Sequence, residues 1–176
     1  MAGLGHLGFG FAAKPLTSKV HLLVLLIATE LIDILWAVFY FTGIDRNTFG
    51  ASSSPWSHSL LMSAIWSVLA ALIAYRVYHD RRSGIVIGLL VFSHCAIDFI
   101  THPMGAILGG KPLPPDLPLF FNGSSNVGLG LYNHSFTIAV ATDIGMLVIG
   151  VGVYVRYRWK TEDRRRKTGD GRRKKE

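Results

Sequence analysis

The chain has 176 residues, of which 50% are hydrophobic and only 16% are charged, and its mean hydropathy is +0.37. This composition argues against a soluble globular protein and is typical of a membrane protein. Residues 156–176 hold eleven of the eighteen Lys and Arg and four of the eleven acids, so this tail alone accounts for the net charge of +7. We interpret the tail as a disordered cytoplasmic segment that contacts anionic lipid headgroups, and we expect no nucleic-acid partner.

The first predicted element is residues 3–16, with the sequence GLGHLGFGFAAKPL. This segment is apolar but too short to span a membrane, so it either lies in the interface or enters the bundle as a re-entrant helix. Four later stretches have the ~20 apolar residues that a ~30 Å hydrocarbon core requires. They cover roughly residues 20–41, 56–78, 84–102 and 131–155. We therefore predict an all-α polytopic membrane bundle of about four transmembrane helices within residues 1–155.

Basic residues are distributed unequally between the two sides of this bundle. They precede the first span, link the second to the third and follow the fourth, whereas the opposite connections contain only Arg46 and Lys111. Because cytoplasmic loops are enriched in Lys and Arg, we expect both termini in the cytoplasm. We also expect Gly84 and Gly88 to allow close helix packing. Residues 103–130 contain five of the seven prolines, and we expect them to fold over the outer end of the bundle as a lid.

The third span contains a polar ridge in the sequence FSHCAIDFITH. His94, Asp98 and His102 recur at i, i+4 and i+8, so they lie on one face of a helix. Cys95 lies about 100° around the helix and is expected to be a buried small side chain. Histidine and carboxylate donors without thiolates suit zinc, manganese or iron, with zinc preferred here. The ridge therefore predicts one wall of an intramembrane metal site.

Other spans also contain carboxylates, at Glu30, Asp33 and Asp143, although the span interiors contain no Lys or Arg. Each such charge costs about 2.5–3.5 kcal/mol at the bilayer centre unless it is neutralised. Helix rise places Glu30 and Asp33 at depths similar to His94 and Asp98, in the middle-to-outer half of the bilayer. A hydrolytic site needs ligands, a position for water and a general base, and we assign the base to Glu30 or Asp98.

Several further polar residues have less specific interpretations. His58 either caps the second span or joins the site, and the roles of His134 and Asp143 stay open. We interpret Asp116 as a turn residue. We interpret His21 and His79 as structural residues at the cytoplasmic boundary.

Five segments occur in an order that resembles a known family. They are GHLGFGFAAK (5–14), ELIDILW (30–36), SPWSHSLLMS (54–63), FSHCAIDFITH (92–102) and GLGLYN (128–133). The family consists of small bacterial inner-membrane proteins described as membrane-bound metal-dependent hydrolases. The resemblance implies a helical protein of the inner membrane with a metal site. The implied ligands are His6, Asp33, His58, His94, Asp98 and His102, with Asp116 a looser match. The chain departs from the family where related proteins carry a P-D-x-D-H type block, because Glu30-Leu-Ile-Asp33 stands there.

Two classes of function remain at this point. The first is a metal-dependent hydrolase that acts on a lipid-like or amphiphilic substrate, with a phosphoester as the natural bond. The alternative is a metal-ion or proton-coupled transporter, or a non-catalytic membrane protein that uses the same His and Asp residues. The inner halves of the spans contain no matching line of acids, which favours the hydrolase.

Overall fold

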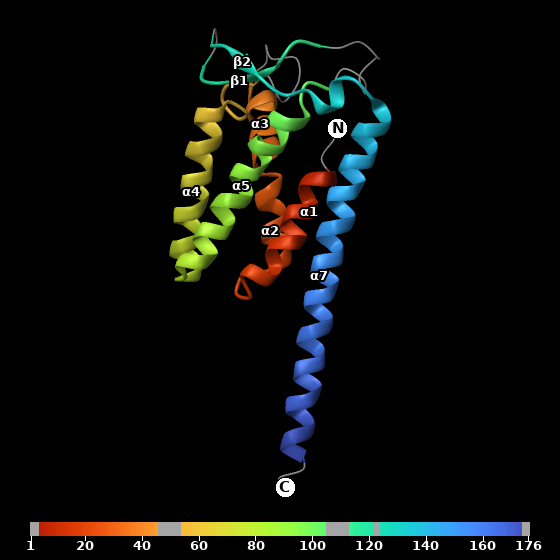
Figure 1. Ribbon diagram of the computed structural model, residues 1–176. Helices are drawn as coiled ribbons and strands as arrows, with labels where there is room; N and C mark the ends of the chain where they lie inside the picture. The colour runs from red at the N-terminus through yellow and green to blue at the C-terminus, as the bar shows by residue number, and fades with distance from the viewer. Residues whose placement is uncertain (1–3, 46–53, 105–112, 122–123, 174–176) are drawn as a thin grey trace.

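A computed structural model describes residues 4–45, 54–104, 113–121 and 124–173, with side chains as far as Thr168. The described chain is mostly helical, as predicted (Figure 1). Its α-helices are α1 (Leu4–Ala13), α2 (Leu22–Thr29), α3 (Leu31–Thr42), α4 (Leu60–Tyr78), α5 (Arg81–Thr101) and α7 (Phe136–Arg173). The other elements are the 3-10 turns η1 (Lys14–Leu16) and η3 (Leu131–Asn133) and a two-stranded antiparallel ribbon of β1 (Leu117–Pro118) and β2 (Asn126–Val127).

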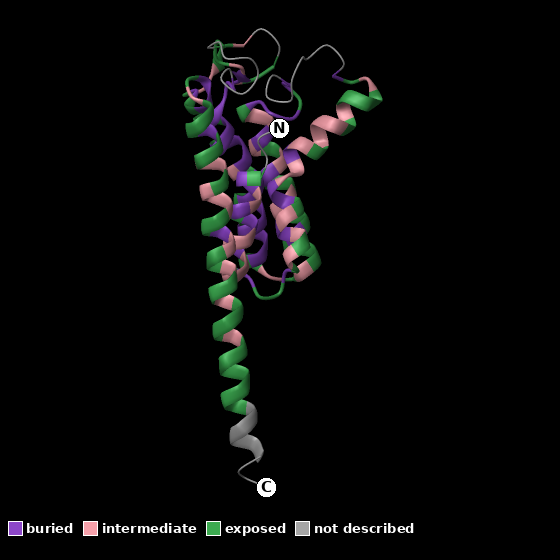
Figure 2. Ribbon diagram, turned by 90° about the vertical axis from the view of Figure 1, so that its right-hand side faces the viewer, coloured by how far each residue is buried: buried purple, intermediate pink, exposed green. Residues whose placement is uncertain are grey.

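Three of the described helices are long and apolar enough to cross a membrane: Leu60–Tyr78, Arg81–Thr101 and Phe136–Thr168. The α2–α3 pair makes a fourth crossing if it counts as one broken span. Only 17% of the most apolar α4 segment and 11% of that of α7 are buried, against 61% for α5, so α5 is the central helix. Figure 2 shows the exposed faces, which a hydrocarbon environment would cover.

The stretch predicted as one continuous helix over 20–41 is broken. α2 and α3 meet at Glu30 with a bend of 60°. In an unbroken helix the Thr29 carbonyl would accept a hydrogen bond from Asp33. Here it accepts one from Nδ1 of His94 at 2.7 Å. A side chain of the third span therefore hydrogen-bonds to a backbone acceptor that an unbroken first span would use itself. The bend between α2 and α3 thus lies at the level of the polar ridge.

Close packing of α4 on α5 depends on two glycines, as the sequence predicts. A Cβ atom added at Gly84 would lie 2.8 Å from the Ala71 carbonyl oxygen, and one at Gly88 would lie 2.9 Å from the Ala71 Cβ. The Ser67 hydroxyl donates a hydrogen bond to the Gly88 carbonyl. Side chains at these two positions would push the helices apart.

The N-terminal helix α1 lies lengthwise against α7. A Cβ atom added at Gly150 would overlap the Gly8 carbonyl, so the two backbones touch. The Asp143 carboxylate accepts a hydrogen bond from the Gly5 N–H at 3.0 Å, which gives this side chain a role that the sequence leaves open. These contacts lie within the apolar part of α7. The sequence allowed residues 3–16 to lie in the interface or to enter the bundle. The described part of this segment, residues 4–16, packs inside the bundle.

The basic connections gather at one end of the molecule, where η1, the α4–α5 junction and the middle of α7 lie (Figure 1). Lys14 donates hydrogen bonds to the carbonyls of Ser18 at 3.1 Å and Val20 at 2.6 Å. Burial, together with the nearby Arg158 charge, lowers the pKa of Lys14. This common end is the arrangement that the distribution of Lys and Arg predicts.

The tail differs from the disordered segment that we expected, because α7 continues as far as Arg173. Arg158 pairs with Glu162 at 3.2 Å and Lys167 pairs with Asp163 at 2.8 Å, both at i, i+4 spacing. Such pairs stabilise an exposed helix, and Arg, Lys and Glu are good helix formers. The helix therefore extends past the apolar segment that ends near Val155.

The segment after α5 folds back over the end of the bundle, as expected of a lid. The Leu119 carbonyl accepts a hydrogen bond from the Leu61 N–H at 3.2 Å, and the His102 carbonyl accepts one from Gly130 at 2.9 Å. Part of the predicted lid, residues 105–112 and 122–123, lies outside the described residues.

Candidate metal centre

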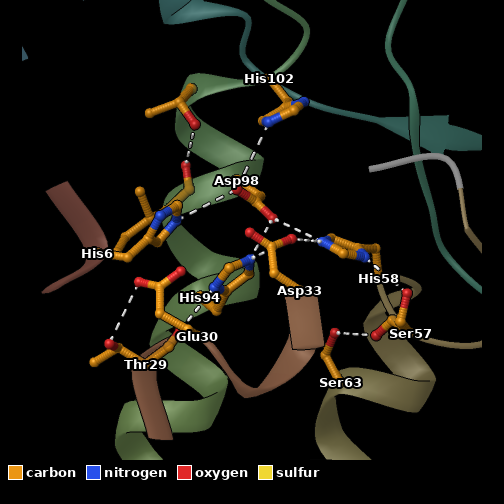
Figure 3. A network of polar contacts seen from close by, with 12 residues as sticks. His6, Thr29, Glu30, Asp33, Ser57, His58, Ser63, His94, Asp98 and His102 are labelled. Atoms are coloured by element: carbon orange, nitrogen blue, oxygen red, sulfur yellow. Dashed lines mark hydrogen bonds and ion pairs between the residues drawn. The ribbon is translucent and has the colours of Figure 1, made fainter. Parts of the chain in front are cut away.

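The six predicted metal ligands form one cluster although they come from five places in the chain (Figure 3). They are His6 on α1, Asp33 on α3, His58 in the turn before α4, His94 and Asp98 on α5, and His102 at the C-terminal cap of α5. All except Asp33 are buried. The Asp33 side chain is 42% exposed, so the cluster is open to its surroundings at Asp33.

Asp98 lies at the centre of this cluster, and its two carboxylate oxygens face different histidines (Figure 3). Oδ2 lies 3.4 Å from Nε2 of His94 and 3.7 Å from Nε2 of His58. Oδ1 lies 3.4 Å from Nε2 of His6 and 3.8 Å from Nε2 of His102. A carboxylate arranged in this way is suited to ligation on both sides, which leaves it less free to act as the general base.

Two carboxylates face the same two histidine nitrogens, Nε2 of His58 and Nε2 of His94. Asp33 Oδ1 lies 3.1 Å from the His58 nitrogen and 3.6 Å from the His94 nitrogen. The distances from Asp98 Oδ2 to these nitrogens, 3.7 Å and 3.4 Å, are similar. Tetrahedral ligands at about 2.0–2.1 Å from a zinc ion are separated by about 3.3–3.4 Å. The four carboxylate-to-histidine distances are close to this separation, while Asp33 and Asp98 belong to two different groups of mutually close ligand atoms.

The outer nitrogens of two histidines are fixed by hydrogen bonds. Nδ1 of His94 donates to the Thr29 carbonyl, so Nε2 is the nitrogen that is directed at the cluster and available to a cation. Nδ1 of His58 lies 2.8 Å from the Ser57 hydroxyl. Hydrogen bonds of this kind orient the histidine ligands of metal sites.

Asp116 has a role that its interpretation as a turn residue missed. Its Oδ2 lies 3.3 Å from Nδ1 of His102, and this contact turns Nε2 of His102 toward Asp98. Asp116 comes from the folded-back segment, so only the tertiary structure brings it to the cluster. The sequence signal was the looser family match at this position.

His6 completes the cluster from the N-terminal side. Its ring stacks on His94 with centroids 4.2 Å apart and planes 13° from parallel. Both of its nitrogens are buried, and neither has a hydrogen-bond partner among the residues that the structure describes. An unsatisfied buried nitrogen is costly. A cation beside Asp98 would supply the missing partner for Nε2.

Glu30 lies beside His94 at the α2–α3 break, outside the groups with metal-ligand spacing (Figure 3). Its carboxylate accepts a hydrogen bond from the Thr29 hydroxyl at 3.5 Å. The other candidates lie elsewhere: His21 caps α2 through the Leu23 N–H, and His134 is exposed. Cys95 is a buried free thiol that belongs to neither group.

The residues present fit a divalent cation. The cluster contains two groups of three residues, and within each group the ligand atoms all lie within 4.8 Å of one another. The first group is His6, His94 and Asp98, and the second is Asp33, His58 and His94. A divalent ion would neutralise the Asp33 and Asp98 charges in a site whose described surroundings offer no Lys or Arg partner. Nitrogen and oxygen donors without thiolate suit zinc, manganese or iron.

Comparisons of the chain with protein-family models, with curated proteins and with solved structures give no match. The function is therefore inferred from the geometry of the cluster and from its surroundings.

Proposed function

We propose that the protein is a membrane-embedded, metal-dependent hydrolase that acts on an amphiphilic substrate. One observation carries this proposal: inside an apolar helical bundle, the Asp33 and Asp98 carboxylates each lie 3.1–3.7 Å from Nε2 of both His58 and His94. A bound zinc ion supplies a water whose pKa is near neutrality, together with a Lewis acid for the scissile bond. The same residues support membership of the family of bacterial membrane-bound metal-dependent hydrolases.

The cluster offers separate residues for binding and for proton transfer. Because Asp98 is surrounded by four histidines, we assign it to metal binding and keep Glu30 as the general base. Glu30 lies beside His94 and is only partly buried, so it can reach a water on the cluster. His6 and His102, on the other oxygen of Asp98, hold that carboxylate in place or bind a second ion. The number of bound ions per chain distinguishes these two roles: one ion if His6 and His102 only hold the carboxylate, and two if they bind a second ion.

The surface next to the cluster fits a hydrocarbon chain. A groove of about 470 Å³ between α2–α3 and α4 is lined by apolar side chains and has α5 as its floor. Ile87 and Val91 belong to this floor. They lie on the same face of α5 as His94 and Asp98, because successive residues of this set are four, three and four positions apart. The groove therefore ends about one helical turn, roughly 5 Å, from the cluster. An amphiphile with its polar head at the cluster would place its chain here.

A phosphoester is the bond we assign. The transition state of its hydrolysis carries spread negative charge, which a cation stabilises well. The bundle interior offers a low dielectric in which that stabilisation is strong.

In the membrane, the basic end of the bundle faces the cytoplasm, and the cluster lies in the outer half of a bacterial inner membrane. The C-terminal tail then lies in the cytoplasm, beside anionic headgroups. The expected cytoplasmic N-terminus falls outside the described residues. Leu4, the first described residue, begins a helix that is tied to Asp143 within the apolar part of α7.

An ion transporter is less well supported. A path from the cluster to the basic end would cross a packed apolar core that includes Val20, Leu25, Ile87, Leu90 and Val91. Ion pathways in membranes are lined by polar or ionisable groups. The core instead closes the cluster on its inner side, as a site for substrates from the outer leaflet requires.

The test is turnover of a p-nitrophenyl phosphoester of a long-chain alcohol by detergent-purified protein loaded with zinc. We expect metal-dependent release of p-nitrophenolate that is lost in Asp98→Asn and retained in Asp80→Asn, a matched change at the basic end. Zinc or proton flux in liposomes, without turnover of any such ester, would contradict the proposal and favour a transporter.

A further inference from the structure

A chain of buried hydrogen bonds leads away from the metal-binding cluster through residues that the sequence did not single out. The Ser57 hydroxyl lies 2.8 Å from Nδ1 of His58 and 2.9 Å from the Ser54 hydroxyl. Ser54 in turn donates to the carboxylate of Asp45. Ser54 and Ser57 are 0% exposed, His58 is 2% exposed and Asp45 is 6% exposed, so bulk water does not compete for these bonds.

Counting protons fixes the direction of this chain. A carboxylate only accepts hydrogen bonds, so the single hydroxyl proton of Ser54 is donated to Asp45. The bond between the two hydroxyls must then use the Ser57 proton. Ser57 has no proton left for His58, so it accepts one from Nδ1–H. The proton on Nδ1 of His58 is therefore fixed, and Nε2 is the nitrogen that faces Asp33 and Asp98. It binds a cation there as a ligand, and without a cation it donates to the Asp33 carboxylate at 3.1 Å.

The opposite tautomer of His58 is disfavoured by the same count. If Ser57 donated to Nδ1, the Ser54 and Ser57 oxygens would face each other at 2.9 Å without a proton between them. Two buried acceptors in contact are costly in a low dielectric. The Nε2–H form would also be unable to ligate a cation through Nε2.

We propose that Asp45 is a positioning residue, which acts through Ser54 and Ser57 to hold His58 in the tautomer that presents Nε2 as a metal ligand. The cationic partner in this statement, and with it the unprotonated Nε2, rests on the proposed function, but the proton on Nδ1 does not. Asp45 follows the end of α3, and Ser54 and Ser57 lie in the turn before α4. The connection between two helices thus supplies the orienting groups for one ligand.

The direct test is ¹⁵N NMR of the histidine side chains in detergent-solubilised full-length protein, recorded without metal and with zinc. We expect Nδ1 of His58 to carry a proton in the wild type, both without metal and with zinc. Ser57→Ala and Asp45→Ala should lose this proton, and Ser57→Thr should restore it because the hydroxyl is kept. Ser93→Ala is the matched control, since the Ser93 hydroxyl beside His94 donates to the Leu90 carbonyl at 2.7 Å, away from this chain.

A second measurement, zinc affinity by chelator competition, links the tautomer to binding. Loss of an orienting partner of this kind typically weakens metal binding by about 10–100-fold, which we expect for Ser57→Ala. A wild-type His58 without a proton on Nδ1, or an Nδ1 proton that is unchanged in metal-free Asp45→Ala, would overturn the positioning role. A correct tautomer in a protein that binds no zinc would instead contradict the proposed function alone.

Discussion

His6 and His94 stack face to face, with ring centroids 4.2 Å apart, although one lies on the N-terminal helix and the other on the central helix of the bundle. The stack brings a histidine nitrogen to within 3.4 Å of Asp98. His6 therefore has two separable contributions, ring packing and a nitrogen donor.

Replacing His6 by phenylalanine keeps a ring on His94 but removes the donor. We expect His6→Phe to keep its Tm within a few degrees of wild type, because the phenyl ring still packs on His94. Its zinc content or affinity should fall. His6→Ala should lower both Tm and zinc affinity. Equal zinc binding by wild type and His6→Phe, measured by chelator competition, would show that His6 is not a ligand.

The position of α1 depends on its backbone contact with α7. A leucine at Gly150 would overlap the Gly8 carbonyl, whereas a Cβ at Gly152 on the same helix meets nothing within 4 Å. Overpacking of this kind typically costs about 1–3 kcal/mol. We expect Gly150→Leu to lower Tm and weaken zinc binding, because it displaces His6. Gly152→Leu is the control and should leave both unchanged; a loss of zinc in both variants would contradict the role of this contact.

Proton transfer and metal binding should separate at Glu30. Glu30→Gln removes a base but no ligand of either metal-binding group. We expect zinc content to stay at the wild-type level while turnover of the phosphoester falls by roughly 10²–10⁴-fold, the usual contribution of a general base. If Glu30→Gln lost its zinc, Glu30 would be a ligand and the assignment of the base would be wrong.

The basic end of the bundle should stabilise the fold in a pH-dependent manner. Asp80 caps α5 by accepting hydrogen bonds from the Ser83 hydroxyl at 2.5 Å and the Ser83 N–H at 2.9 Å, which hold its pKa below the usual 3.8. A carboxyl whose pKa is lowered on folding stabilises the protein above its unfolded pKa and loses that contribution as pH falls through the folded value. We therefore expect Asp80→Asn to lower Tm at neutral pH.

The Tm difference between wild type and Asp80→Asn should shrink as pH falls below about 3.8 and then vanish. Asp163→Asn, a matched change on the exposed part of α7, should show a much smaller difference at every pH. A difference for Asp80→Asn that did not depend on pH would contradict this account of the cap.

Local sequence patterns predicted what depends on local geometry. The lengths of the apolar stretches predicted the helices, and i, i+4 spacing placed His94 and Asp98 on one face. The family resemblance added His6 and Asp116, but not the reason they reach the cluster. His6 arrives because Gly8 and Gly150 let α1 pack inside the bundle.

Other features depend on contacts between distant segments, which no single-sequence pattern encodes. The break at Glu30 coincides with the hydrogen bond from His94 to the Thr29 carbonyl. Asp143, whose role stays open in the sequence, accepts a hydrogen bond from the Gly5 N–H at the start of α1. The hydrogen-bond chain to Asp45 runs through serines that resemble ordinary turn residues in the sequence.

The central claim, that Asp33, His58, His94 and Asp98 hold a cation, is tested most directly by elemental analysis of protein purified in detergent without added metal. We predict about one transition-metal ion per chain in the wild type, because the two groups of ligand atoms share His94, and a large loss in His94→Ala and Asp98→Asn. A folded wild-type protein without bound metal, or variants that retain the wild-type content, would contradict the claim.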